Sequence, residues 1–234
     1  MPITHLLIDL DDTILNFHAA ERRALKATLE AFGLDPSDQN CRIYSEINLG
    51  FWQALERGEI TRERLLVARF EALYIRLLGL SRPHPSAAET QAFYEKRLSE
   101  GHDFMPGAKE MLDALHGKYK LYLASNGNIA VQRPRIRDAE IAPYFEDIFI
   151  SEEMGADKPS KEYFDLCFAR MPDAHRDRTA IVGDSLTSDI LGGNRAGIHT
   201  IRYNPTGSLS RMDIIPEFEI TNLADLPHLL ENIP

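Results

Sequence analysis

Short apolar runs alternate with helical patterns along much of this chain, and this alternation constrains the fold more than any other feature. Each run is nearly continuous and bounded by turn-forming residues, as is typical of a strand buried on both faces of a parallel sheet. The runs cover residues 3–8, 121–124, 148–150, 180–182 and 200–203. Helical patterns lie between them, over residues 108–116, 161–171 and 189–196. The alternation predicts an α/β fold with a doubly wound parallel, Rossmann-like sheet, whose ligands bind beyond the carboxyl ends of the strands.

Residues 18–103 break this alternation, because they show helical periodicity alone. The expected helices cover residues 20–32, 44–56, 62–78 and 87–100. Since they follow the first strand directly, we expect an all-helical cap domain inserted into the α/β core. The core domain then comprises residues 1–17 and 104–234, and the cap domain residues 18–103.

The charge balance limits the kinds of partner. The chain has 26 Lys and Arg against 36 Asp and Glu, which gives a formal net charge of −10. Because nucleic acid is bound mainly through clustered Lys and Arg, a nucleic acid polymer is excluded as the main partner. The sequence also lacks an apolar stretch of roughly 20 residues, so we expect no membrane span.

The N-terminal apolar run and the cysteines indicate in which cellular compartment the protein is expected. Residues 6–8 have no basic segment before them and no cleavage site after them, so we expect neither a signal peptide nor an anchor. Cys41 and Cys167 are too far apart in sequence for a zinc or redox motif, and so few thiols suit a reducing compartment. We expect a cytoplasmic protein that is a monomer or a weak dimer.

An acidic cluster, Asp9-Leu10-Asp11-Asp12, follows the first expected strand. Side chains two apart on an extended segment point the same way, so Asp9 and Asp11 can share one pocket. Two like charges held close either share a proton or bind a hard cation such as Mg²⁺ through their oxygens. The alternative is a turn whose acids cap the next helix.

The second expected strand is followed by Ser125-Asn126-Gly127-Asn128. A hydroxyl and backbone N–H groups at a strand-to-helix turn offer an anion site, and a simple N-terminal helix cap is the alternative. After the third strand comes Asp157-Lys158-Pro159. Proline restricts the backbone there, so Lys158 is either aimed at a phosphoryl oxygen or simply solvated.

The fourth cluster follows the strand expected over residues 180–182. It places Asp184 at the strand end and Asp189 in the first turn of the next helix, where helix capping is the alternative role for Asp189. The four clusters therefore occur in order, each near the carboxyl end of a strand, where an α/β fold gathers its ligand site.

These clusters together resemble the motifs of the haloacid dehalogenase-like hydrolase superfamily: D-x-D-x-T, then Ser, then Lys-Pro, then G-D-x₄-D. The helical insertion resembles the C1-type cap of its subfamily IA. Residues 51–61, 68–71 and 150–155 are similar to the branch of pyrimidine 5′-nucleotidases. The resemblance implies a Mg²⁺-dependent phosphatase acting on a small phosphorylated metabolite, with nucleoside 5′-monophosphates as the favoured substrates.

The resemblance also implies roles for the catalytic residues. Asp9 is the implied nucleophile, which forms an aspartyl-phosphate. Asp11 is the implied general acid, which protonates the leaving oxygen and then activates water as a base. Ser125 and Lys158 complete the implied catalytic set.

The remaining implied roles concern substrate and metal. The implied phosphoryl-binding residues are Ser125, Asn126, Gly127 and Lys158. The implied Mg²⁺ site consists of Asp9, Asp11 through its backbone carbonyl, Asp184 and, in support, Asp189.

Within the superfamily, the second acid at Asp11 favours a phosphatase over a dehalogenase, which keeps the nucleophile but lacks that acid. A phosphomutase is a further alternative, although those related to this branch usually carry Gly where Thr13 stands. A sugar-phosphate or phosphoglycolate-type phosphatase, or a phosphate-sensing regulatory protein on the same fold, also stays open. No motif is lost, and this favours an enzyme.

The residues that line the substrate pocket are less well defined by the sequence. The aromatic cap residues Phe51, Trp52, Phe70 and Tyr74 either stack on a base or form the core of the cap, and Asn48 and Arg69 are weaker candidates for substrate contact. Pro134 lies in the helix expected after Gly127, where it predicts a kink or a delayed helix start.

Overall fold

The computed structural model describes residues 2–80, 84–208 and 213–233. Residue contacts divide the chain into two compact units. Unit 1 comprises Met1–Phe17 and His102–Pro234, and unit 2 comprises His18–Gly101. We describe each unit by itself.

Unit 1 contains a six-stranded parallel sheet in the order β3-β2-β1-β4-β5-β6. The strands are β1 (His5–Ile8), β2 (Lys120–Ser125), β3 (Asp147–Ile150), β4 (Thr179–Gly183), β5 (His199–Tyr203) and β6 (Phe218–Ile220). In the central register, Ile8 of β1 pairs with Leu123 of β2 and with Val182 of β4. This order is that of a doubly wound sheet, so the expected fold class is confirmed. The edge strand β6 was not predicted.

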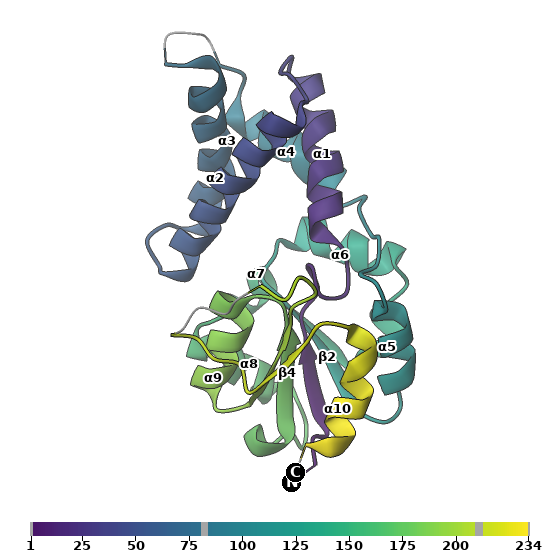
Figure 1. Ribbon diagram of the computed structural model, residues 1–234. Coiled ribbons are helices and arrows are strands. Elements are labelled where there is room, and N and C mark those ends of the chain that lie inside the picture. The colour runs from purple at the N-terminus through teal and green to yellow at the C-terminus, as the bar shows by residue number, and fades with distance from the viewer. Residues whose placement is uncertain (1, 81–83, 209–212, 234) are drawn as a thin grey trace. The chain divides into compact units, whose positions relative to one another are not determined.

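Helices cover both faces of this sheet, as Figure 1 shows. They are α5 (Ala108–Leu115), α6 (Ile129–Asp138), α7 (Ser151–Met154), α8 (Lys161–Ala169), α9 (Leu191–Ala196) and α10 (Leu226–Asn232). Apolar side chains of α5, α6 and α10 form one core with alternate strand residues such as Leu6 and Ile8. Those of α8 and α9 form a second core with the intervening residues, such as Leu7. Burial on both faces explains why the strands read as continuous apolar runs.

Two helices of unit 1 differ from the sequence-based expectation. The segment before α9 is a π-helix, Leu186–Ile190, so helical structure begins three residues earlier than expected. Helix α6 begins at Ile129, five residues ahead of Pro134, so the expected delayed start is wrong. Pro134 has no N–H to donate to the preceding turn, but the first turn is already closed by hydrogen bonds from Val131 and Gln132 to the carbonyl of Asn128.

The described residues of unit 2 form four helices: α1 (Phe17–Ala31), α2 (Asp38–Glu56), α3 (Arg62–Leu78) and α4 (Ala87–Leu98). The side chain of Ser37 caps α2, so that helix begins at Asp38, six residues earlier than expected. Phe70 and Tyr74 are buried in the core of the unit, whereas Phe51 and Trp52 are partly exposed on α2. Two of the four aromatic candidates are therefore packing residues.

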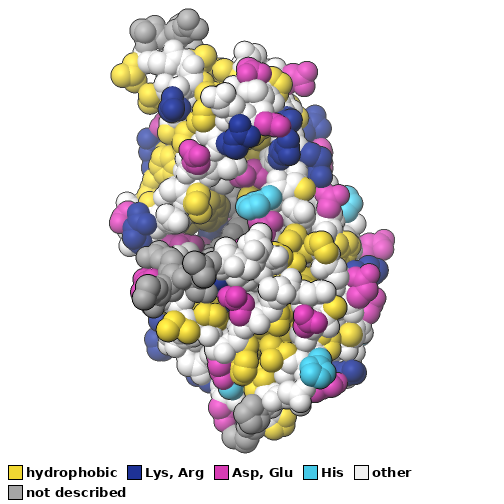
Figure 2. All heavy atoms as spheres, in the orientation of Figure 1, with side chains coloured by type: hydrophobic (Ala, Val, Ile, Leu, Met, Phe, Trp, Pro, Cys, Tyr) yellow, Lys and Arg dark blue, Asp and Glu magenta, His cyan; other side chains and the backbone are white. Residues whose placement is uncertain are grey.

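The surface of unit 2 carries mixed charge. Lys and Arg side chains lie beside Asp and Glu on the face drawn in Figure 2. Ion pairs at the surface of the unit include Arg22 with Asp38 and Arg64 with Glu71. Among the described residues, no helix combines the length and the apolar character that a membrane crossing requires.

Candidate active site

The carboxyl ends of three neighbouring strands position the candidate site. Asp9 directly follows β1, Ser125 is the last residue of β2, and Asp184 directly follows β4. Because β1 lies between β2 and β4, these residues meet at one edge of the sheet. Lys158 reaches the same place from the loop between α7 and α8.

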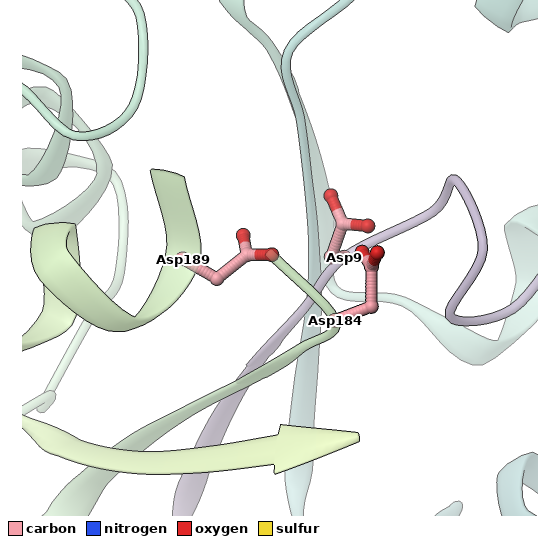
Figure 3. A group of neighbouring side chains, drawn as sticks. All are labelled: Asp9, Asp184 and Asp189. Carbon is pink, nitrogen blue, oxygen red and sulfur yellow. The ribbon is translucent and has the colours of Figure 1, made fainter. Parts of the chain in front are cut away.

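Three carboxylates form an acidic cluster there. Asp9, Asp184 and Asp189 each offer an oxygen, and these oxygens lie within 4.8 Å of one another (Figure 3). Asp189 comes from the π-helix, and its Oδ2 accepts a hydrogen bond from the backbone N–H of Ser185 at 3.2 Å. Gly183 makes this packing possible, since a Cβ atom there would lie 2.2 Å from Oδ2 of Asp189.

Lys158 neutralises part of this charge from a fully buried position. Its Nζ donates to Oδ1 of Asp9 at 2.7 Å, to Oδ1 of Asp189 at 2.6 Å and to the carbonyl of Ala124 at 2.7 Å. Burial alone would lower the pKa of Lys158, but the charges of Asp189 and Asp9 raise it above its usual value. All three N–H groups have protein acceptors, so a phosphoryl oxygen would have to replace one of them.

One lysine does not balance the negative charge that three ionised carboxylates would carry. Burial raises the pKa of Asp9 to about 8; Lys158 opposes this shift, whereas Asp189 and Asp11 add to it. Burial and the charges of Asp9, Asp189 and Asp12 likewise raise the pKa of Asp184 well above its usual value. Three carboxylates sharing one ammonium group are a donor set that fits a divalent, oxygen-preferring cation such as Mg²⁺.

The side chain of Asp11 does not join this acidic cluster. Its Oδ1 accepts a hydrogen bond from Arg135 Nη1, and its Oδ2 accepts one from Gln132 Nε2 at 2.6 Å. Asp11 lies close enough for its charge to raise the pKa of Asp9. The two acids therefore have different surroundings, because the carboxylate of Asp11 faces donors on α6 and the carboxylate of Asp9 faces the acidic cluster.

The loop after β2 supports its neighbours. Ser125 is buried, and its Oγ accepts a hydrogen bond from Gln132 Nε2 at 2.9 Å. The side chain of Asn126 donates from Nδ2 to the carbonyl of Lys158 at 2.8 Å, and its Oδ1 accepts from the backbone N–H of Lys158 at 2.9 Å. Gly127 packs directly on Gln132, since a Cβ atom at Gly127 would lie 2.5 Å from its Nε2.

Gln132 and Arg135 were not predicted as site residues. Both are buried, at 2% and 0% exposure, although they are polar and lie on a helix next to exposed residues. A possible signal was present: the two residues are three apart, so they share one face of the helix that follows Ser125.

A doubly wound sheet with a cluster of carboxylates and a buried lysine at its carboxyl edge is the arrangement of an α/β enzyme, whose ligand site lies at that edge. Residues 3–197 match the family described as haloacid dehalogenase-like hydrolase, and this chain belongs to that family. The expected resemblance is thereby confirmed.

Several relatives are similar over nearly the whole chain. The putative HAD-hydrolase YfnB of Bacillus subtilis is 40% identical over 225 residues, which cover 96% of this chain and 94% of YfnB. Pyrimidine 5′-nucleotidase PynA of Streptococcus pneumoniae is 34% identical, covering 97% of this chain and 94% of PynA. Pyrimidine 5′-nucleotidase YjjG of Escherichia coli is 28% identical, covering 96% of each chain. With such relatives, the expected enzyme class of phosphoric monoester hydrolase is confirmed.

Solved structures agree with this assignment. A crystal structure of YfnB from Bacillus subtilis bound to magnesium superposes with a TM-score of 0.92 at 39% identity, covering 100% of both chains. The L-2-haloacid dehalogenase of Xanthobacter autotrophicus has a TM-score of 0.75 at 16% identity, covering 99% of this chain and 100% of that chain. The second likeness concerns the fold alone.

Proposed function

We propose that this protein is a Mg²⁺-dependent phosphatase that hydrolyses small phosphate monoesters, with nucleoside 5′-monophosphates as its substrates. The observation that carries the proposal is the cluster of Asp9, Asp184 and Asp189, in which the buried Lys158 bonds to Asp9 and Asp189. The preference for nucleotides is supported by similarity to PynA and YjjG, which are pyrimidine 5′-nucleotidases.

Hydrolysis then proceeds in two transfers of one phosphoryl group. In the first, a carboxylate oxygen of Asp9 attacks phosphorus while the bond to the leaving oxygen breaks, and Asp11 donates a proton to that oxygen. In the second, Asp11 takes a proton from water, the water oxygen attacks phosphorus, and the bond to Asp9 breaks. The products are the alcohol and inorganic phosphate, and both acids return to their starting state.

The other residues of the site orient the nucleophile, bind the phosphoryl oxygens and balance their charge. Lys158 holds Oδ1 of Asp9 at 2.7 Å and so fixes the rotation of the nucleophile. Ser125 and the backbone N–H groups around Asn126 and Gly127 are proposed to bind the phosphoryl oxygens. Bound at Asp9, the carbonyl of Asp11 and Asp184, with support from Asp189, Mg²⁺ would neutralise the charge that develops on the phosphoryl group.

We also propose a cytoplasmic location and a monomer or weak dimer. Cys41 and Cys167 are buried free thiols, which suits a reducing compartment.

The experiment is phosphate release from a panel of monoesters: dUMP, dTMP, UMP, AMP, sugar phosphates and phosphoglycolate, each with Mg²⁺ and with EDTA. The proposal expects Mg²⁺-dependent release with the pyrimidine nucleotides turned over fastest. Faster release from the sugar phosphates would favour the second candidate, which the 28% identity to a ribulose-1,5-bisphosphate 5-phosphatase of Halopiger xanaduensis supports. No release from any ester, with EDTA changing nothing, would refute the phosphatase proposal.

A further inference from the structure

The carboxylate of Asp11 is held at both oxygens by two residues of α6. Arg135 Nη1 donates to Oδ1, and Gln132 Nε2 donates to Oδ2 at 2.6 Å. The two holding groups are also joined to each other, because Arg135 Nη1 donates to Gln132 Oε1 at 2.8 Å. Gln132 Nε2 extends the chain of bonds to Ser125 Oγ at 2.9 Å. A residue on β2 is thus connected through α6 to the segment that follows β1.

Burying the polar side chains of Gln132 and Arg135 is unfavourable unless hydrogen-bond partners compensate for the lost water. Arg135 is fully buried, and taking an ionised side chain out of water is unfavourable before its partners are counted. An apolar residue would fill the same space on the core side of α6 without that cost. The bonds to Asp11 and Gln132 provide the compensation, since a hydrogen bond from an ionised donor is about twice as strong as one between neutral groups.

Helix α6 is itself fixed from the opposite side. The backbone N–H of Ile129 donates to Glu152 Oε2 at 2.6 Å. Arg133 donates to both oxygens of Glu153, at 2.9 and 2.6 Å. Glu152 and Glu153 belong to α7, which follows β3. These contacts fix the rotation of α6 and therefore the direction in which Gln132 and Arg135 point.

We infer that Gln132 and Arg135 are positioning residues that aim the carboxyl group of Asp11 for proton transfer to the leaving oxygen. The inference rests on the proposed phosphatase function. Proton transfer needs the acid within hydrogen-bond reach of the oxygen, and a misplacement of about 1 Å can cost about 100-fold in rate. With both oxygens held by donors from a fixed helix, the carboxyl group has one preferred orientation.

The test separates positioning from simple support of the fold by varying the leaving group. Gln132→Met keeps the length of the side chain and removes both donated bonds. We expect its kcat/KM to fall about 10- to 100-fold on an alkyl ester such as UMP, whose leaving oxygen needs a proton. On p-nitrophenyl phosphate, whose leaving group departs without one, we expect a fall of less than about 3-fold. The quantity kcat/KM is used because it ends at the first irreversible step, when the leaving group departs.

Three further variants make the result specific. Asp11→Asn is the reference and should show the same dependence on leaving group with a larger loss, about 10²- to 10⁴-fold on UMP. Arg135→Lys keeps the charge but not the geometry of the guanidinium group, and should lose activity in the same pattern. Arg137→Met is the matched control, because Arg137 lies on the same helix, pairs with Asp138 at the surface and has 72% of its side chain exposed; it should not change the ratio between the two esters.

A second readout is independent of turnover. The rise in melting temperature on adding Mg²⁺ should be unchanged in Gln132→Met, because that side chain does not belong to the acidic cluster. An equal loss on both esters, no loss on either, or a lost Mg²⁺ response would each overturn the inference. The proposed function fails separately, if the unaltered protein releases no phosphate from either ester.

Discussion

The Nζ atom of Lys158 lies 2.7 Å from Oδ1 of Asp9, although 149 positions separate the two residues in sequence. The same Nζ lies 2.6 Å from Oδ1 of Asp189, so one ammonium group joins the segments after β1 and β4 to the loop before α8. The contact has two effects: it links separate segments at the edge of the sheet, and its positive charge holds two buried carboxylates beside each other.

Replacing Lys158 by Met therefore tests both roles. Asp9 and Asp189 would lose their buried cation, and breaking a buried ion pair typically costs about 3–5 kcal/mol. We expect the free energy of unfolding at pH 7 to fall by about 3 kcal/mol in urea titrations without Mg²⁺. Phosphate release should fall at least about 100-fold, because fixed charge at the reacting group is lost.

The matched control is Lys161→Met. Lys161 is exposed and pairs with Asp165 at the surface, so its loss should change stability by less than about 0.5 kcal/mol. If Lys158→Met were as stable and as active as Lys161→Met, the central role of Lys158 would be wrong.

The strands could be predicted from sequence because their burial on both faces leaves a local signal. Strand β6 could not, since Phe218–Ile220 has three residues, one of them exposed, at an edge of the sheet. The start of α2 was also missed. The apolar pattern becomes clear at Tyr44, whereas the helix begins at the cap provided by Ser37.

The candidate site divides in the same way. Asp9, Ser125 and Asp184 could be placed together because each lies at a strand end, which is a local property. Gln132 and Arg135 could not, because their contacts with Asp11 join residues 121 and 124 positions apart. Those contacts depend on how α6 is rotated, and α7 fixes that rotation through Glu152 and Glu153.

Gly183→Ala should damage the site without removing a polar group. The added Cβ atom would lie 2.2 Å from Oδ2 of Asp189, so the carboxylate that accepts a hydrogen bond from Lys158 must shift. We expect a loss of about 1–3 kcal/mol in the free energy of unfolding and a clear fall in phosphate release. In Gly50→Ala, by contrast, the new methyl group meets nothing within 4 Å on helix α2, and stability should rise by about 0.5–1 kcal/mol. Equal effects of the two substitutions would contradict this account.

Asp9→Asn should abolish turnover while the protein stays folded. The amide keeps the size of the carboxyl group, and Lys158 keeps its bond to Asp189. We expect phosphate release to fall about 10⁴-fold or more, as for other catalytic nucleophiles, with an unchanged circular dichroism spectrum. Retained activity in this variant would remove Asp9 as the nucleophile.

Mg²⁺ binding should depend on pH because protons compete for the same carboxylates. The pKa of Asp9 is raised from 3.8 to about 8, and that of Asp184 is also raised. Folded protein therefore holds these protons more tightly than unfolded protein, so their contribution to stability is complete below about pH 4 and is lost as the pH rises through about 8. Mg²⁺ needs the ionised form, and its affinity should increase between pH 6 and pH 8.5.

Calorimetry provides the measurement for this prediction. Titrating Mg²⁺ at pH 7 in two buffers of different ionisation enthalpy should give different heats, because binding releases protons. Asp184→Asn should bind Mg²⁺ more weakly and release fewer protons. Identical affinities at pH 6 and pH 8.5, with identical heats in both buffers, would disprove the coupling.

The last prediction concerns unit 2, where Arg69 was a candidate for substrate contact. Arg69 is 3% exposed, and it donates to Gln91 Oε1 at 2.8 and 3.2 Å and to Asn48 Oδ1 at 2.8 Å. Asn48 in turn donates to Glu21 Oε1 at 2.9 Å. These contacts make Arg69 the centre of a buried polar network among the four helices of the unit.

Arg69→Met should therefore destabilise the protein by about 3 kcal/mol, because two buried amide oxygens lose their donor and each unsatisfied group costs about 1–3 kcal/mol. Arg64→Met is the matched substitution on the same helix. Arg64 has 57% of its side chain exposed and pairs with Glu71 at the surface, so the expected change is within about 0.5 kcal/mol. Urea unfolding followed by circular dichroism compares the two. A stable Arg69→Met variant would mean that the network contributes little to the packing of unit 2, and it would make Arg69 available again as a residue for substrate recognition.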